Sequence, residues 1–220
     1  MRPSLHGGPT RHQRAWLSPG WRARVRSVLS PEACAALEAW FARDRPAEVA
    51  RSTSGGEPAV ALSVTLPATR WLARIDLVVA RDAVHRVGTP PRLSDALHAA
   101  PPAWIPPLAE LDRAATAVGV PLSVTGSLAW QHHIGETYVT DSTRVDLLFR
   151  PRTQEALAGI LEVLRAREGW GGPRLGGEVV LGRDDHVSWV DLARGRRRVL
   201  VKGAGREDVA DVAPLLASLR

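Results

Sequence analysis

The sequence predicts an α+β protein with two parts: a small N-terminal α/β domain, then a mixed sheet with flanking helices. In the first half, alternating β-branched stretches are separated by Gly, Pro and Thr, which is typical of a small antiparallel sheet. In the second half, strand-like and helix-like stretches alternate. The proline-rich segment 88–107 between them has the composition of a connector. We therefore predict domains at residues 1–105 and 106–220.

The first domain is expected to contain one helix and three strands. Ser30 followed by Pro31 is a favourable N-cap and first-turn pair, so we predict a helix over residues 31–43. The strands are predicted at 47–52, 58–66 and 71–80. One face of their sheet is expected to carry Leu62, Val64, Ile75 and Leu77.

The connector and the start of the second domain are expected to be mainly helical. A short helix is predicted at 93–99 and a longer one at 107–118. A short strand at 121–124 then leads through Gly126-Ser127 into a second element that carries Trp130 and Gln131.

The remaining elements follow from periodicity. We predict a buried strand at 143–149, then a helix at 154–168 in which apolar residues recur at i, i+3, i+4 and i+7. Short strands are expected at 178–181, 186–192 and 197–201. The closing segment 207–219 is predicted to be an amphipathic helix despite Pro214.

The charge of the chain says little about its partners. The net charge is +6 and the pI is near 10.9, but arginine supplies nearly all of the positive charge and Lys202 is the only lysine. That bias, with abundant Ala, Gly and Pro, resembles the composition that a GC-rich genome produces. A nucleic-acid-binding module has only this charge in its favour, because neither an aromatic-basic stripe nor a helix-turn-helix pattern is present. We therefore expect no nucleic-acid partner.

Cysteine and hydropathy patterns bear on location. Cys34 is the single cysteine, so an internal disulfide is impossible and a reducing compartment is the simplest setting. No run approaches the roughly 18 apolar residues of a membrane span. The expectation is a soluble, cytoplasmic protein without a membrane partner.

The segment 124–149 contains the residues best suited to chemistry. Glycine lets a backbone come close to a phosphate, and Gly126 is followed by a serine hydroxyl. Arg144 and Asp146 lie two apart on the predicted strand 143–149 and so project from the same face. A Gly-Ser turn beside a strand with an acidic side chain is typical of nucleotidyltransferases, in which strand carboxylates hold Mg2+ against a triphosphate.

Several motifs together resemble one family. They are G-S-L-A-W-Q at 126–131, Gly135, Tyr138, V-D-L-L at 145–148, Arg11-His12, Leu93-Ser94, V-S-W-V-D-L-A at 187–193 and V-L-V-K at 199–202. This set is similar to the phosphoribosyl-dephospho-CoA transferases, the holo-acyl-carrier-protein synthases of malonate decarboxylase, over nearly the whole chain.

The resemblance implies a specific reaction and site. The family transfers phosphoribosyl-dephospho-CoA from triphosphoribosyl-dephospho-CoA to a serine of the acyl-carrier subunit and releases pyrophosphate. Carried over by position, Asp146 is a catalytic carboxylate and Mg2+ ligand, and Asp191 can be a second. The substrate-binding positions are Gly126, Ser127, Gln131, Tyr138, Arg144 and Lys202. For Trp130, Gln131 and Tyr138 a structural role fits the motif equally well.

Two departures from the family pattern concern the metal site. Arg144 stands where the pattern S-D-L-D-L-L has its first aspartate, and Gly176 stands where R-L-D-G-E has an aspartate. An arginine can reach Asp146 or the triphosphate but cannot bind a cation. The third carboxylate is either the one lost at position 176 or Asp191.

Two hypotheses from different classes follow. The first is a nucleotidyltransferase that modifies the malonate decarboxylase carrier protein. The second is a catalytically impaired relative that binds the coenzyme precursor or the carrier without transfer, which Arg144 favours.

Overall fold

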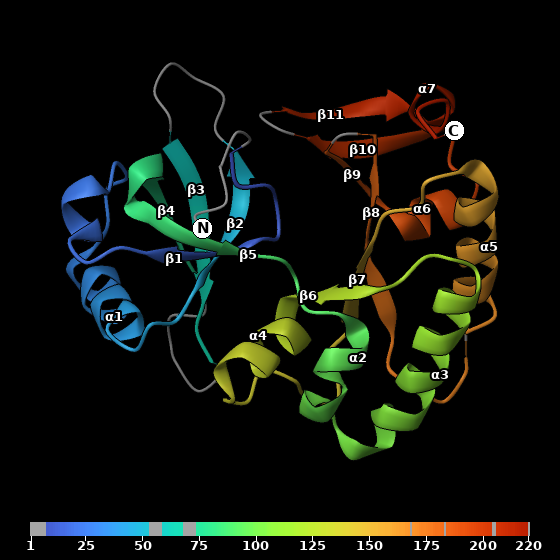
Figure 1. Cartoon of the computed structure of the whole chain (residues 1–220), viewed down its shortest axis with the longest axis horizontal. Coiled ribbons are helices and arrows are strands. Elements are labelled where there is room, and N and C mark those ends of the chain that lie inside the picture. The colour runs from blue at the N-terminus through green and yellow to red at the C-terminus, as the bar shows by residue number, and fades with distance from the viewer. Residues whose placement is uncertain are drawn as a thin grey trace, which may run out of the picture. The chain divides into compact units, whose positions relative to one another are not determined.

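The computed structural model describes residues 8–52, 59–67, 74–167, 169–182, 184–203 and 206–219. The chain divides into two compact units, Met1–Thr89 and Pro90–Arg220 (Figure 1). This division precedes the boundary expected from the sequence, at residues 105 and 106. The reason is that Leu93 is fully buried in the core of the second unit and its backbone N–H donates to the carbonyl of Leu122 at 3.0 Å.

The first unit contains a five-stranded antiparallel sheet in the order β4-β3-β2-β1-β5. Its elements are β1 (Arg14–Leu17), α1 (Pro31–Phe41), β2 (Ala47–Ser52), β3 (Ala59–Thr65), β4 (Arg74–Ala80) and β5 (Val84–Gly88). The predicted α1 and the three predicted strands are confirmed, except that Pro58 and residues 71–73 lie outside the described residues. Strands β1 and β5 were not predicted from the sequence.

The packing of this sheet confirms the predicted apolar face. Leu62 pairs with Leu77 and Val64 pairs with Ile75, and all four side chains are buried. Helix α1 begins as expected, because the Ser30 hydroxyl accepts a hydrogen bond from the N–H of Ala33 at 3.2 Å.

The second unit contains a six-stranded mixed sheet in the order β11-β10-β9-β8-β7-β6. The strands β7 and β8 are parallel, and the other neighbouring pairs are antiparallel. Its strands are β6 (Ser123–Thr125), β7 (Val145–Phe149), β8 (Leu175–Leu181), β9 (Asp185–Ser188), β10 (Arg198–Gly203) and β11 (Arg206–Asp211). Its α-helices are α2 (Leu93–Ala96), α3 (Ile105–Ala117), α4 (Gly126–Ile134), α5 (Gln154–Arg165), α6 (Trp189–Ala193) and α7 (Val212–Leu216).

Two predictions for the C-terminal part were wrong. The strand predicted at 186–192 ends at Ser188, because the Ser188 hydroxyl caps α6 by accepting from the N–H of Asp191. The helix predicted at 207–219 is β11 followed by the short α7. Residues 206–211 pair with β10 over their whole length, and this tertiary pairing outweighs the helical pattern of the segment.

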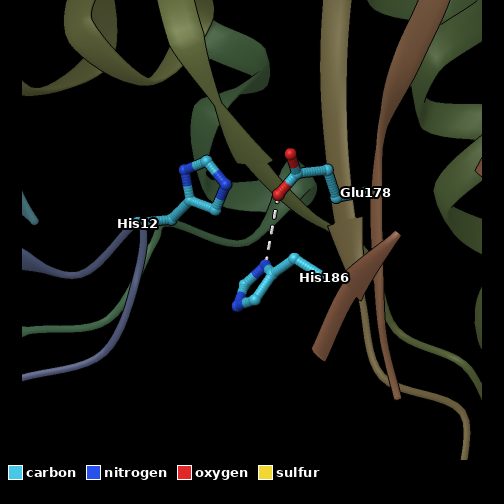
Figure 2. A group of neighbouring side chains, drawn as sticks. All are labelled: His12, Glu178 and His186. Atoms are coloured by element: carbon cyan, nitrogen blue, oxygen red, sulfur yellow. Dashed lines mark ion pairs between the residues drawn. The ribbon is translucent and has the colours of Figure 1, made fainter. Parts of the chain in front are cut away.

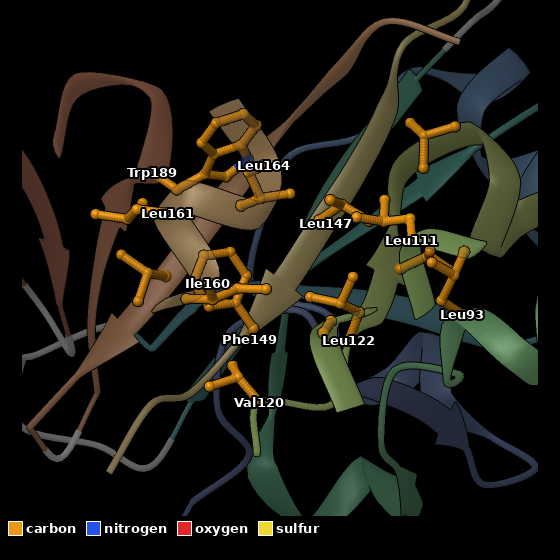
Figure 3. Packing of buried hydrophobic residues seen from close by; sticks show 14 of the residues in the cluster. Leu93, Leu111, Val120, Leu122, Leu147, Phe149, Ile160, Leu161, Leu164 and Trp189 are labelled. Atoms are coloured by element: carbon orange, nitrogen blue, oxygen red, sulfur yellow. The ribbon is translucent and has the colours of Figure 1, made fainter. Parts of the chain in front are cut away.

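The two faces of this sheet differ in polarity. On one face Leu147 and Phe149 pack with Leu111, Ile160 and Leu164 of the helices (Figure 3). The strand register places four polar residues on the opposite face: Asp146, Glu178, His186 and Lys202. The polar face is therefore where a site can be built. Among the described residues, no helix has the length and apolar character that crossing a bilayer requires.

Candidate active site on the polar face of the second sheet

Helix α4 begins directly beside Asp146. Thr125, the last residue of β6, pairs with Asp146 across the strands, and Gly126 then opens the helix with a φ of +62°. A Cβ at Gly126 would lie 2.8 Å from Asp146 Oδ2, so both the backbone angle and the close approach require glycine. The N-terminal turn of α4, with Ser127 in it, carries a partial positive charge. An anion held there would lie next to the Asp146 carboxylate.

The carboxylate of Asp146 is bound by Arg144. Arg144 Nε donates to Asp146 Oδ1 at 2.8 Å, and Arg144 Nη2 is also 2.8 Å from that oxygen. The Arg144 side chain is 57% exposed and that of Asp146 is 27% exposed, so the pair is open to a ligand. Because Arg144 and Asp146 are two residues apart in extended chain, their side chains project to the same side and form the contact that the spacing predicts.

Gly176 makes room for this ion pair. In the parallel register Gly176 of β8 stands opposite Asp146. A Cβ at Gly176 would lie 2.8 Å from Arg144 Cζ, and closer still to Nε and Cδ. Any side chain at position 176 would therefore displace the guanidinium. Position 176, where the family pattern has an aspartate, belongs to β8, one of the two strands that pair with β7.

The side chains around Asp146 do not provide the set of oxygen ligands that a protein uses to hold a divalent cation. Asp146 supplies the single carboxylate at this end of β7, and Gly176 opposite it supplies none. The guanidinium of Arg144 already pairs with the Asp146 carboxylate. Mg2+ is usually held by one or two free carboxylates together with phosphate oxygens. The expected Mg2+ site at Asp146 and Asp191 stays a prediction.

Asp191 lies on a different layer from Asp146. It is in α6, which lies beside α5 (Figure 1). Trp189 and Leu192 of α6 belong to the same hydrophobic core as the buried residues of α5. That core covers the face of β7 that bears Leu147, whereas Asp146 projects from the opposite face. The structure thus does not bring these two carboxylates together on one face.

Gln131 and Tyr138 hold the segment that follows α4. Gln131 Oε1 accepts from the backbone N–H groups of Tyr138 and Val139, at 2.9 and 2.8 Å. Gln131 Nε2 donates to the carbonyl of Ala99 at 2.6 Å. The Tyr138 ring is buried and stacks on Trp130, with ring centroids 6.3 Å apart. These contacts give all three motif residues a structural role, and the expected contacts of Gln131 and Tyr138 with substrate stay predictions.

Lys202 belongs to an ionic cluster farther along the polar face. Lys202 Nζ lies 3.3 Å from Glu178 Oε1. Glu178 Oε2 lies 3.2 Å from His186 Nδ1, an ion pair that Figure 2 shows as a dashed line. His186 Nε2 is 3.2 Å from Asp184 Oδ1. Glu178 and His186 were not predicted as site residues from the sequence. The available signal was the residue spacing, since Glu178 is two residues after Gly176 and therefore on the same face.

Comparisons with known proteins decide the family. Residues 10–90 match the family described as "Phosphoribosyl-dephospho-CoA transferase MdcG N-terminal domain", and residues 92–212 match "Phosphoribosyl-dephospho-CoA transferase MdcG C-terminal domain". The chain belongs to the phosphoribosyl-dephospho-CoA transferase family. The junction between the two matches coincides with the division of the structure after Thr89.

Individual relatives agree with this assignment. The phosphoribosyl-dephospho-CoA transferase of Bradyrhizobium diazoefficiens is 33% identical over 212 residues, which cover 95% of this chain and 94% of the relative. The transferase of the same name from Xanthomonas campestris is 34% identical over 194 residues, covering 87% of this chain and 89% of the relative. No solved structure gives a significant match. The names of these phosphoribosyl-dephospho-CoA transferases indicate that the chain is a transferase.

Proposed function

We propose that this protein transfers phosphoribosyl-dephospho-CoA from triphosphoribosyl-dephospho-CoA to a serine of the malonate decarboxylase acyl-carrier subunit. The serine oxygen forms a bond to the phosphorus nearest the ribose, the bond from that phosphorus to pyrophosphate breaks, and the serine proton leaves to solvent. The reaction is a nucleotidyl transfer with a protein hydroxyl as acceptor. Positioning and charge neutralisation supply most of the catalysis in such reactions.

The observation that carries the proposal is the contact of Gly126 with Asp146. This contact places the N-terminus of α4, which includes Ser127, beside Asp146. Asp146 also binds the guanidinium of Arg144. Backbone N–H groups and the helix dipole favour a phosphate at such a terminus. The remaining N–H groups of Arg144 are free of Asp146 and can neutralise a neighbouring phosphate oxygen.

A second candidate function rests on the same ion pair. Because Arg144 neutralises Asp146, the site has less carboxylate charge than a metal-dependent transfer uses. A relative that binds the coenzyme precursor or the carrier protein without transfer would retain the fold and lose the reaction.

Mass spectrometry of the purified apo carrier subunit distinguishes these candidates. The carrier is incubated with this protein, Mg2+ and triphosphoribosyl-dephospho-CoA, in parallel with the Arg144→Asp variant and with Asp146→Asn. Labelling by the natural protein and not by Asp146→Asn supports the transferase. Labelling by Arg144→Asp alone shows that the natural arginine prevents the reaction, and the binding-only candidate then replaces the first.

A further inference from the structure

A hollow of about 760 Å³ lies at one end of the second sheet, among residues that the proposed transfer leaves unused. Its walls are the C-terminal end of α5, the loop 169–174 and helix α6. A volume of this size is typical of sites for small molecules. One lining residue, Arg174, is joined to the strand that carries Asp146, because the N–H of Val145 donates to the carbonyl of Arg174 at 2.9 Å.

The loop is shaped around the indole of Trp170. Gly169 and Gly171 have φ values of +74° and +71°, which favour glycine. A Cβ at Gly172 would lie 2.6 Å from Trp170 Cε2, so the backbone follows the ring closely. Trp170 Nε1 donates to the carbonyl of Pro173 at 3.2 Å and fixes the ring further. The guanidinium of Arg167 lies over the same ring, with Cζ 5.4 Å from the ring centroid. The indole of Trp170 is therefore held in place at the wall of the hollow.

The charged residues around the hollow are all arginines. Arg165, Arg167, Arg174 and Arg194 line it, and the described lining residues include no aspartate or glutamate. Arg165 and Arg167 are paired with Glu162 and Glu110 outside the hollow. Arg174 and Arg194 are exposed, and within the described part of the chain no carboxylate pairs with either. Arg174 Nη2 donates to the carbonyl of Ser142 at 2.7 Å, which leaves its other N–H groups for a ligand. The rim thus attracts an anion.

The inner wall of the hollow includes Trp189. Trp189 is only 7% exposed, and among the described residues its Nε1 has no hydrogen-bond partner. Because Nε1 is enclosed by the protein, a ligand in the hollow meets the ring of Trp189 and not this N–H. Together, the hollow provides an aromatic ring and two exposed guanidinium groups that no described carboxylate neutralises.

We infer that this hollow binds a nucleotide, with the base stacked on Trp170 and a phosphate group beside Arg174 and Arg194. Bases stack on aromatic side chains, and arginine binds phosphate oxygens through paired N–H groups. The identity of the nucleotide rests on the proposed function, whose donor substrate carries an adenosine diphosphate group in its dephospho-CoA part. The hollow then holds the adenine end of the donor at the end of the sheet where the N–H of Val145 donates to the carbonyl of Arg174, on the helical side of the sheet.

Calorimetric titration of the full chain with dephospho-CoA and with 5′-AMP tests the site. Replacing Trp170 by Ala should weaken binding at least about tenfold, the usual effect of losing one stacked base. Trp170→Phe keeps an aromatic face and should bind within about threefold of the natural protein. The matched control is Trp16→Ala, because Trp16 also has an arginine over its ring, Arg86 at 3.8 Å, but belongs to the first unit.

Two further variants test how much the arginine charges contribute to binding. Arg174→Ala and Arg194→Ala should each weaken dephospho-CoA binding and reduce its dependence on salt concentration. Thermal unfolding of every variant shows whether the fold is retained. Equal affinity of Trp170→Ala and the natural protein, or no binding of either ligand to the natural protein, overturns the inference. Binding of 5′-AMP without binding of dephospho-CoA would assign the hollow to a free nucleotide instead of the donor substrate.

The carrier-labelling assay separates this inference from the proposed function. If dephospho-CoA binds through Trp170 and the carrier is never labelled, the nucleotide site stands and the transfer is wrong. If Trp170→Ala labels the carrier with an unchanged KM for the donor, the transfer stands and the nucleotide site is wrong.

Discussion

The side chain of Arg144 lies over Gly176, the residue of β8 that stands opposite Asp146. The absence of a side chain at one position is thus what allows the guanidinium to reach the carboxylate. The two departures from the family pattern, at positions 144 and 176, are neighbours in space and are linked by this contact.

Replacing Gly176 by Ala is expected to displace Arg144 from Asp146. The added Cβ would come within 2.8 Å of Arg144 Cζ, and an exposed arginine can move away at little cost in stability. The affinity for tripolyphosphate, measured by calorimetry, should fall several-fold while the melting temperature stays nearly constant. Gly159→Ala is the control, because a Cβ there makes only ordinary contact, at 3.5 Å from Val118. Equal losses in both variants would contradict this account.

The natural protein is expected to bind Mn2+ only weakly at this site. Arg144 competes for the same Asp146 oxygen that a cation needs. Arg144→Ser should therefore raise the affinity for Mn2+, observed by electron paramagnetic resonance, and the combined Arg144→Ser, Asp146→Asn variant should abolish the gain. Strong Mn2+ binding by the natural protein that Asp146→Asn removes would show that the ion pair does not exclude the metal.

Gly126→Ala should cost both stability and phosphate binding. A left-handed backbone angle costs a non-glycine residue about 1 kcal/mol, and the added methyl group would also press on Asp146 Oδ2. Gly119→Ala provides the comparison, since Gly119 has a φ of +73° but no atom within 4 Å of its Cβ position. Urea unfolding should show the larger loss for Gly126→Ala, and only that variant should lose tripolyphosphate affinity. If the two variants behave alike, the contact with Asp146 has no energetic role.

The first unit should lose stability in acid through Glu48. Burial raises the pKa of Glu48, but the hydrogen bond from His12 and the charge of Arg14 outweigh it and lower the pKa from 4.5 to about 2. The stabilisation is complete above pH 4.5, where the carboxylate is charged in both folded and unfolded chains. It is lost as the pH falls from 4.5 towards 2, because the unfolded chain binds the proton first. The loss amounts to about 3 kcal/mol.

Urea unfolding of the full chain at pH 5 and pH 2.5 measures this effect. The matched variant is Arg14→Met with Glu48→Met, which replaces the buried pair by apolar side chains of similar size. Its free energy of unfolding should fall less over this pH range than that of the natural protein. An identical fall in both would show that Glu48 titrates normally in the folded state.

Local pattern predicted much of the second unit. Helix α5 has four apolar residues at helical spacing, and all four, Leu157, Ile160, Leu161 and Leu164, are buried. The Gly-Ser start of α4 and the strand with Asp146 were also predictable, since a turn glycine and a period of two are local signals. Where local pattern conflicted with pairing to another strand, as in β11, the prediction failed.

By itself, the sequence determined the α+β class, the family, and the expectation that Arg144 and Asp146 share one face. Only the tertiary structure decided that Gly176 lies opposite Asp146, that Asp191 lies on the helical layer, and that Trp170 and Trp189 line one hollow. The physical reason is the separation along the chain between the residues that determine each feature. Helix caps, turns and side-chain periodicity depend on neighbours a few residues away, whereas strand order and register depend on which distant segments bury apolar surface together.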